Sequence, residues 1–144
     1  GQPDGSGELA ALEGMTAAQA AKKITLLALG IAWQRFRESL EEQQEVLAAI
    51  SNLTMAAFAM ESCVLRAAKS GSEQAKRYTQ VYCEETLTAV EATARELFAA
   101  CGEGDPLRLN LTILRRLAKR DPVDTIGLRR EIAAKLLESG KYTA

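Results

Sequence analysis

Two stretches of the chain share one apolar spacing, and this repeat restricts the fold more than any other feature. Apolar residues recur in steps of four, three, four, three and four, which places them on one face of an α-helix. In the first stretch they are Val46, Ile50, Leu53, Ala57, Met60 and Val64. In the second they are Cys83, Leu87, Val90, Ala94, Leu97 and Cys101. Because each face must be buried against other helices, the pattern predicts an all-α bundle.

Capping and breaking residues divide most of the chain into three long helices. A capping box at Thr16–Gln19 predicts a first helix that runs to about Glu38, and a second box at Ser39–Glu42 begins the next helix. The first helix carries Ile24, Leu27, Ile31 and Trp33. The connection Ser70–Ser72 is short, which favours an antiparallel return, and Gly102 is the expected C-terminal cap of the third helix. We therefore expect an up-and-down bundle, and no segment alternates as a strand would.

Two short helices are expected at the C-terminal end. Asp105–Pro106 provides an N-cap followed by proline at the first helical position. The helix that follows carries Leu107, Leu111, Leu114 and Leu117. Asp121–Pro122 closes this helix, Asp124 or Thr125 caps the last one, and Gly140 ends it. The inward residues of the last helix are Leu128, Ile132 and Leu136.

The chain is expected to form one domain. Its 144 residues match the length of about 150 residues that is usual for a single domain. Gly1–Gly7 is small and polar without an apolar period, which is typical of a linker or the remnant of a trimmed tag. We therefore assign residues 1–15 to such a segment and residues 16–144 to the bundle. The chain begins with Gly, so we expect a piece cut from a longer protein.

The composition excludes several classes of function. The chain has no histidine, which removes Ser-His triads, Cys-His pairs and histidine metal sites. Its net charge of −1 argues against a nucleic-acid binder. Cys63, Cys83 and Cys101 have no paired spacing, so we expect buried reduced thiols and a cytoplasmic location. No apolar run approaches about 18 residues, so we expect no membrane-spanning segment.

No residue stands out as catalytic, cofactor-binding or metal-binding. Carboxylates are paired at Glu41–Glu42 and Glu84–Glu85, and without histidine we expect them on solvated faces. Glu61 borders the first apolar stripe, so it needs a partner, and a structural ion pair or an edge position is favoured over a catalytic acid. The glycines at 5–7 and 102–104 do not follow strands and so do not predict phosphate loops.

The C-terminal end is basic. Residues 107–144 carry nine basic and four acidic side chains, so residues 1–106 are net acidic. We expect this end to rest on the acidic helices of its own bundle, with association with another domain as the second interpretation. The candidate residues for docking between domains are Arg115, Arg116, Arg129 and Arg130. Their charge reversal is expected to weaken docking without unfolding the bundle.

Several stretches resemble a known family. They are Leu40–Leu47, Ala57–Ser62, Leu65–Ala67 and Asp124–Ala133, continuing to Ser139–Tyr142. They resemble the C-terminal extension of very-long-chain-type acyl-CoA dehydrogenases, most of all that of the bacterial members. The resemblance covers nearly everything from Gly7 to the end.

The resemblance implies a longer enzyme with a flavin-dependent core. Such a core contains FAD, oxidises an acyl-CoA to the trans-2-enoyl-CoA in fatty-acid β-oxidation, and passes electrons to an electron-transfer flavoprotein. The catalytic Glu lies in that core, and the family's E-G-T segment has no counterpart here, since Glu13–Met15 and Glu103–Asp105 differ from it. No catalytic or flavin-binding residue therefore carries over to this chain.

The chain itself would then be an accessory domain without catalysis of its own. The resemblance implies that it packs on the catalytic core of the same polypeptide and sets the state of a homo-oligomer, such as a homodimer. Animal members link the extension to membrane association through a longer segment between helices. Here that connection is only Ser70–Ser72, which speaks against contact with a membrane surface.

Two alternatives of other classes are open. The first is a free-standing helical protein-interaction module, complete in this chain. The second is a small all-helical enzyme that holds an anionic substrate with Arg and Lys. The second would need basic side chains that point into the bundle, whereas the stripes described above are apolar.

Overall fold

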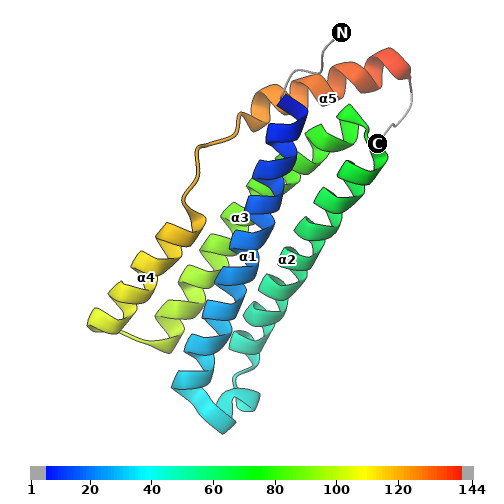
Figure 1. The fold of residues 1–144 in the computed structure, drawn as a ribbon. Helices are drawn as coiled ribbons and strands as arrows, with labels where there is room; N and C mark the ends of the chain where they lie inside the picture. The colour runs from blue at the N-terminus through cyan, green and yellow to red at the C-terminus, as the bar shows by residue number, and fades with distance from the viewer. Residues whose placement is uncertain (1–5, 141–144) are drawn as a thin grey trace.

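The computed structural model describes residues 6–140, in which helices pack into an up-and-down bundle (Figure 1). In chain order the elements are α1 (Ser6–Phe36), the 3₁₀ helix η1 (Arg37–Glu42), α2 (Gln44–Ser70), α3 (Glu73–Cys101), α4 (Gly104–Ala118) and α5 (Thr125–Ser139). The described part of the chain contains no strand. The expected all-α architecture, with three long helices and two short C-terminal ones, is confirmed.

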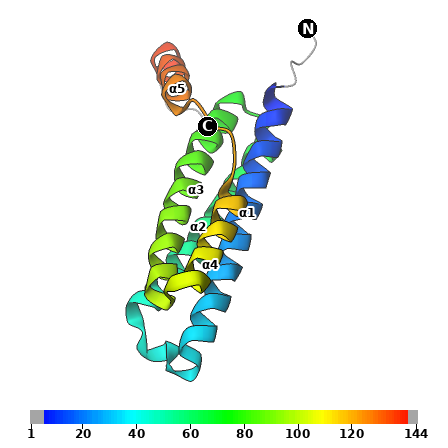
Figure 2. The same ribbon diagram turned by 90° about the vertical axis from the view of Figure 1, so that its left-hand side faces the viewer.

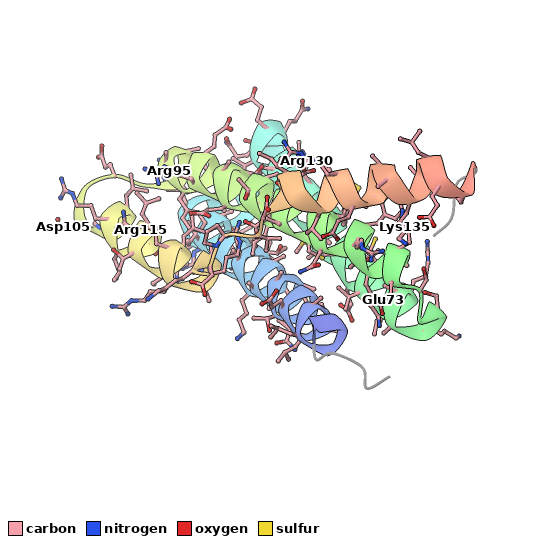
Figure 3. The ribbon with its side chains drawn as sticks, turned by 90° about the horizontal axis from the view of Figure 1, so that it is seen from above. Glu73, Arg95, Asp105, Arg115, Arg130 and Lys135 are labelled. Atoms are coloured by element: carbon pink, nitrogen blue, oxygen red, sulfur yellow. The ribbon has the colours of Figure 1, made fainter. Side chains whose placement is uncertain are left out.

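The three long helices form the centre of the bundle. Each of α1, α2 and α3 packs on the other two, while α4 packs on α1 and α3 without touching α2. Figure 2 shows α4 beside α1 and α3, with α2 behind. Helix α5 crosses the end of the bundle and packs on α3 (Figure 3). The bundle therefore leaves one side of α1 and α2 without a covering helix.

Both predicted apolar stripes are in the core. Every member is buried except Ile50, which packs against the core at partial exposure. Helix α1 contributes Ile24 and four small side chains to the same core. These four, like Ile24, are fully buried: Ala18, Ala21, Ala28 and Ala32. At Gly14 the helices come so close that an added Cβ would lie 3.1 Å from a methyl group of Val64. Small residues on α1 thus allow close helix packing.

The predicted break between the first two long helices is confirmed, but its capping box is wrong. The chain turns through η1, where Arg37 has a φ of 51°, and α2 begins only at Gln44. The Ser39 hydroxyl donates to the carbonyl of Phe36 at 2.5 Å instead of capping a helix. Leu40 is buried in the core, which holds this tight turn in place.

The first helix begins earlier than predicted. Helix α1 starts at Ser6, so residues 6–15, expected to be a linker, are helical, and residues 1–5 lie outside the described part. The Thr16 hydroxyl donates to the carbonyl of Leu12 at 2.8 Å, within the helix, and does not cap it. The packing of Gly14 and Met15 against the bundle extends the helix past the predicted cap.

The joint between α3 and α4 differs in detail from the prediction. Helix α3 ends at Cys101 as expected, but Gly102 has extended backbone, and the left-handed conformation occurs at Gly104 (φ 65°). Helix α4 begins at Gly104 with Glu103 at the N-cap, so the prediction that Asp105 is the cap is wrong. The Asp105 carboxylate instead pairs with Arg108 at 2.7 Å in the first turn.

The ends of the last helix follow the prediction. The Asp124 carboxylate accepts from the backbone N–H of Gly127 at 2.9 Å, which is the expected N-cap. Gly140 ends α5 with a φ of 67°. Helix α4 ends at Ala118, before the predicted Asp121–Pro122, and residues 119–124 form a connector without helix. Lys141 and Tyr142, used in the family resemblance, lie outside the described residues.

Candidate functional site

The four arginines predicted to dock another domain do not form one patch. Arg115 and Arg116 lie on α4, Arg129 and Arg130 lie on α5, and all four are exposed. Figure 3 shows Arg115 and Arg130 on separate elements. Arg129 is held in an ion pair with Glu85 of α3. Their role in docking stays a prediction.

The basic C-terminal end rests in part on acidic side chains of α3, as expected. Arg120 of the connector binds Glu84 at 2.9 Å and the hydroxyl of Thr88 at 2.8 Å. A second nitrogen of Arg120 lies 3.9 Å from Glu91 and donates to the carbonyl of Ala118 at 2.7 Å. Since the Arg120 and Glu84 side chains are largely buried, this cluster fixes the connector to the bundle.

Helix α5 is held on α3 by a second polar cluster. The buried Gln74 donates to the backbone carbonyl of Ile132 at 3.2 Å. Its own side-chain oxygen accepts from Arg77 at 3.2 Å, and Arg77 also binds Glu131 at 3.1 Å. Ile132 is buried beside these groups. The polar atoms of this contact therefore satisfy one another, which is what a fixed structural joint requires.

Glu61 has the structural role that its position suggested. It forms an ion pair with Lys22 of α1, which links α2 to α1. Both side chains are partly exposed, which is typical of a pair at the edge of a core. The Glu84 and Glu85 carboxylates, expected on a solvated face, instead bind Arg120 and Arg129. Within residues 6–140, no three Cys, Asp or Glu side chains are grouped to hold a metal ion.

The three cysteines are free thiols. Cys83 and Cys101 are buried, and Cys63 is half-buried. Burial raises the pKa of the Cys83 thiol to about 12, and the nearby Cys63 adds to the shift. Burial also raises the pKa of Cys101, although Arg35 acts in the opposite direction. A nucleophilic cysteine needs a lowered pKa, so neither buried thiol fits that role.

A hollow on the surface does not fit a flavin cofactor. It measures about 900 Å³ and lies between α1, α3 and the connector. Its charged lining consists of Glu13, Glu73, Glu84, Asp121, Asp124, Glu131, Lys76, Arg77, Lys119 and Arg120. Most of these cations are already bound to carboxylates. The pyrophosphate of FAD needs free cations or backbone N–H groups, so a hollow richer in carboxylates than in cations is unsuited to it.

The sequence interpretation missed an exposed apolar surface on α1 and α2. We define the α1–α2 face as Leu26, Leu29 and Trp33 of α1 with Leu47, Met55, Phe58 and Leu65 of α2. These side chains are exposed, Phe58 by 73% and Leu26 by 69%. The steps of three and four from Leu26 to Trp33 were visible in the sequence as a second stripe. Such a surface marks a contact site on a folded domain.

Helix α2 also departs from the expectation that no segment could span a membrane. Gln44–Ser70 is long and apolar enough to do so, judged by length and composition alone. Only 22% of its most apolar window is buried in the bundle. Part of this apolarity belongs to the core stripe and part to the α1–α2 face, so one helix supplies apolar residues to two surfaces.

Comparison with known proteins places this architecture among the C-terminal domains of acyl-CoA dehydrogenases. Residues 20–116 match the family described as the C-terminal domain of acyl-CoA dehydrogenase. A probable acyl-CoA dehydrogenase of Bacillus subtilis (strain 168) is 38% identical over 130 residues, which covers 85% of this chain and 22% of that protein.

A solved structure shares the fold. The crystal structure of acyl-CoA dehydrogenase complexed with FAD from Bacillus anthracis superimposes with a TM-score of 0.86 at 38% identity. The match covers 91% of this chain and 24% of that one. The chain thus spans about a quarter of the length of these relatives.

Proposed function

Since the chain belongs to the acyl-CoA dehydrogenase C-terminal domain family, we propose that it serves as the accessory helical domain of a longer, FAD-dependent acyl-CoA dehydrogenase. The observation that carries the proposal is the match of both sequence and fold over most of the chain. The alternative of a free-standing interaction module is not favoured, because similarity over 91% of this chain is to one part of a larger enzyme.

The chemistry of the proposed enzyme would lie outside this chain. FAD, when bound to the parent enzyme, would accept the electrons removed from the acyl-CoA during fatty-acid β-oxidation. The chain has no histidine, burial raises the pKa of the Cys83 and Cys101 thiols, and the acidic hollow does not fit the cofactor. The side chains of this domain therefore pack, orient and dock, and they take part in no chemical step.

The finer assignments extend the same proposal. We assign the parent to the very-long-chain type, in a cytoplasmic location, with an electron-transfer flavoprotein as the electron acceptor. The domain packs on the catalytic core of its own polypeptide and thereby sets the state of a homo-oligomer, such as a homodimer. The rigid joints at Arg120 and Gln74 support a structural role, because they hold the short helices in fixed positions.

The gene that encodes the chain tests this proposal. The DNA upstream of Gly1 is expected to continue the same reading frame into a flavin-type core. A start codon at that position, with no core encoded before it, would overturn the proposal and favour the free-standing module. The result of this test does not depend on which surface of the bundle docks.

A further inference from the structure

The α1–α2 face joins two apolar stripes on neighbouring helices. Lys22 and Glu61 form an ion pair that links α1 to α2. One turn beyond Lys22, Leu26, Leu29 and Trp33 continue along the same side of α1. Phe58 precedes Glu61 by one turn on the antiparallel α2. The ion pair therefore shows that the exposed apolar residues of α1 and those of α2 lie on the same side of the molecule.

The α1–α2 face is long and wide enough to form a contact with another protein domain. From Leu47 to Leu65 the stripe on α2 spans eighteen residues, or about 27 Å at 1.5 Å per residue. The neighbouring helix adds a second row at a spacing of about 8–10 Å. The face includes an exposed Trp33, Met55 and Phe58, and aromatic residues and Met are enriched at protein interfaces. The single ion pair between the rows also suits a protein interface better than a lipid phase.

Gly30 adds a second observation on this part of α1. It lies inside α1, one turn from Leu26 and from Trp33, and it is exposed. A Cβ built on it would meet nothing within 4 Å, so the packing of this bundle does not require glycine there. Glycine inside a helix costs about 1 kcal/mol relative to Ala. A partner that packs closely against the helix at Gly30 would explain why the cost is tolerated.

We infer that the α1–α2 face, with the exposed helix surface at Gly30, is the surface on which the flavoprotein core of the same polypeptide docks. This inference rests on the proposed function. The core is the favoured occupant because the relatives extend this chain about fourfold, so the largest available partner is tethered to the domain. The part that covers the face presents apolar side chains, one of which lies against Gly30.

Hydroxyl-radical labelling tests the inference, since Trp, Met and Phe side chains react readily when exposed. The reagent is applied to the isolated chain and to the complete polypeptide, and the modification of Trp33, Met55 and Phe58 is measured by mass spectrometry. Tyr82 of α3, which is exposed outside this face, reports the radical dose. We expect all three side chains to be modified in the isolated chain and to lose most of that labelling in the complete polypeptide.

Two substitutions, each of which introduces Gln, extend the test in the complete polypeptide. Gly30→Gln places a long side chain on the exposed helix surface at Gly30, and Leu137→Gln changes an exposed residue of α5 outside the face. Gly30→Gln is expected to restore the labelling of Trp33 and Phe58, while Leu137→Gln leaves them protected. Identical protection in both variants would overturn the assignment of Gly30 to the interface.

The other occupants of the face give different results. Protection in the isolated chain that grows with protein concentration would identify a second copy and overturn the inference. Protection that appears only with vesicles of phosphatidylcholine and phosphatidylglycerol would identify a membrane and overturn it as well. Equal labelling in both proteins, in a complete polypeptide that contains flavin and oxidises acyl-CoA, would refute this interface alone. A complete polypeptide without flavin would refute the proposed function.

Discussion

The open surroundings of Gly30 lead to a prediction about the stability of the chain itself. In the isolated chain nothing covers Gly30, and a Cβ would meet no neighbour within 4 Å. Gly30→Ala therefore keeps every native contact and reduces the conformational freedom of the unfolded chain. We expect the free energy of unfolding to rise by about 0.8 kcal/mol, and the melting temperature to rise by about 2–3 °C for a chain of this length.

Gly14 provides the matched control, because it lies in the same helix. The same substitution would place a Cβ 3.1 Å from Val64 in the close contact between α1 and α2, so repulsion offsets the gain in helix propensity. Urea unfolding of both variants, followed by circular dichroism, measures the difference. The reasoning is refuted if Gly30→Ala is no more stable than the parent chain, or if Gly14→Ala gains as much.

Three further predictions concern the connector, a buried thiol and a helix cap. Arg120→Ala removes the bonds that hold the connector on α3 and is expected to cost about 2 kcal/mol, whereas the exposed Arg130→Ala changes stability little; equal urea midpoints would contradict this. The raised pKa of Cys83, about 12, means that the folded state disfavours the thiolate. The contribution of the neutral Cys83 thiol to the free energy of unfolding is therefore fully present below the ordinary pKa of the thiol near 9, and it is lost as pH rises from there towards 12. Cys83→Ala should flatten the decline of stability over that range, and an unchanged pH profile would refute the assignment. Asp124→Ala removes the N-cap of α5 at a cost of about 1 kcal/mol, which should appear as faster amide hydrogen exchange in α5, with α2 exchange unchanged; equal acceleration in both helices would argue against a local role.

The core could be predicted from the sequence because the apolar spacing that reveals it is also what makes the helices pack together. The regular spacing of Leu53 and Met60 on α2, and of Leu87 and Leu97 on α3, is the spacing of side chains that face one another in the bundle. Helix starts were harder to predict, since a capping sequence competes with tertiary contacts. At Thr16 the contacts of neighbouring residues continue the helix, and the hydroxyl bonds within it instead.

The orientation of α1 shows why the exposed face was missed. Its buried positions are mostly alanines such as Ala21 and Ala28, whereas Leu26 and Trp33, which are larger and more apolar, face outwards. A pattern search that weighs apolar size assigns the large residues to the core. That the alanines are buried instead can be inferred only when the close packing of α1 on its neighbours is known, because small side chains are what allow that packing.

The candidate arginines could be found but not placed by sequence. Their abundance near the C-terminus was evident, and the expected contact of this end with acidic side chains of the bundle occurs at Arg120 and Arg129, on α3. The separation of Arg115 from Arg130 on two different helices depends on the path of the connector (Figure 3). Charge reversal of these arginines in the complete polypeptide still tests their part in docking.

The central claim is that this chain is a domain of a flavin enzyme and carries no catalysis of its own. The most direct test measures the flavin absorbance and the acyl-CoA-dependent reduction of a dye, for the complete polypeptide and for the isolated chain side by side. The account predicts a flavin spectrum and activity in the complete polypeptide, and neither in the isolated chain. Flavin bound by the isolated chain, or a complete polypeptide without flavin or activity, would contradict it.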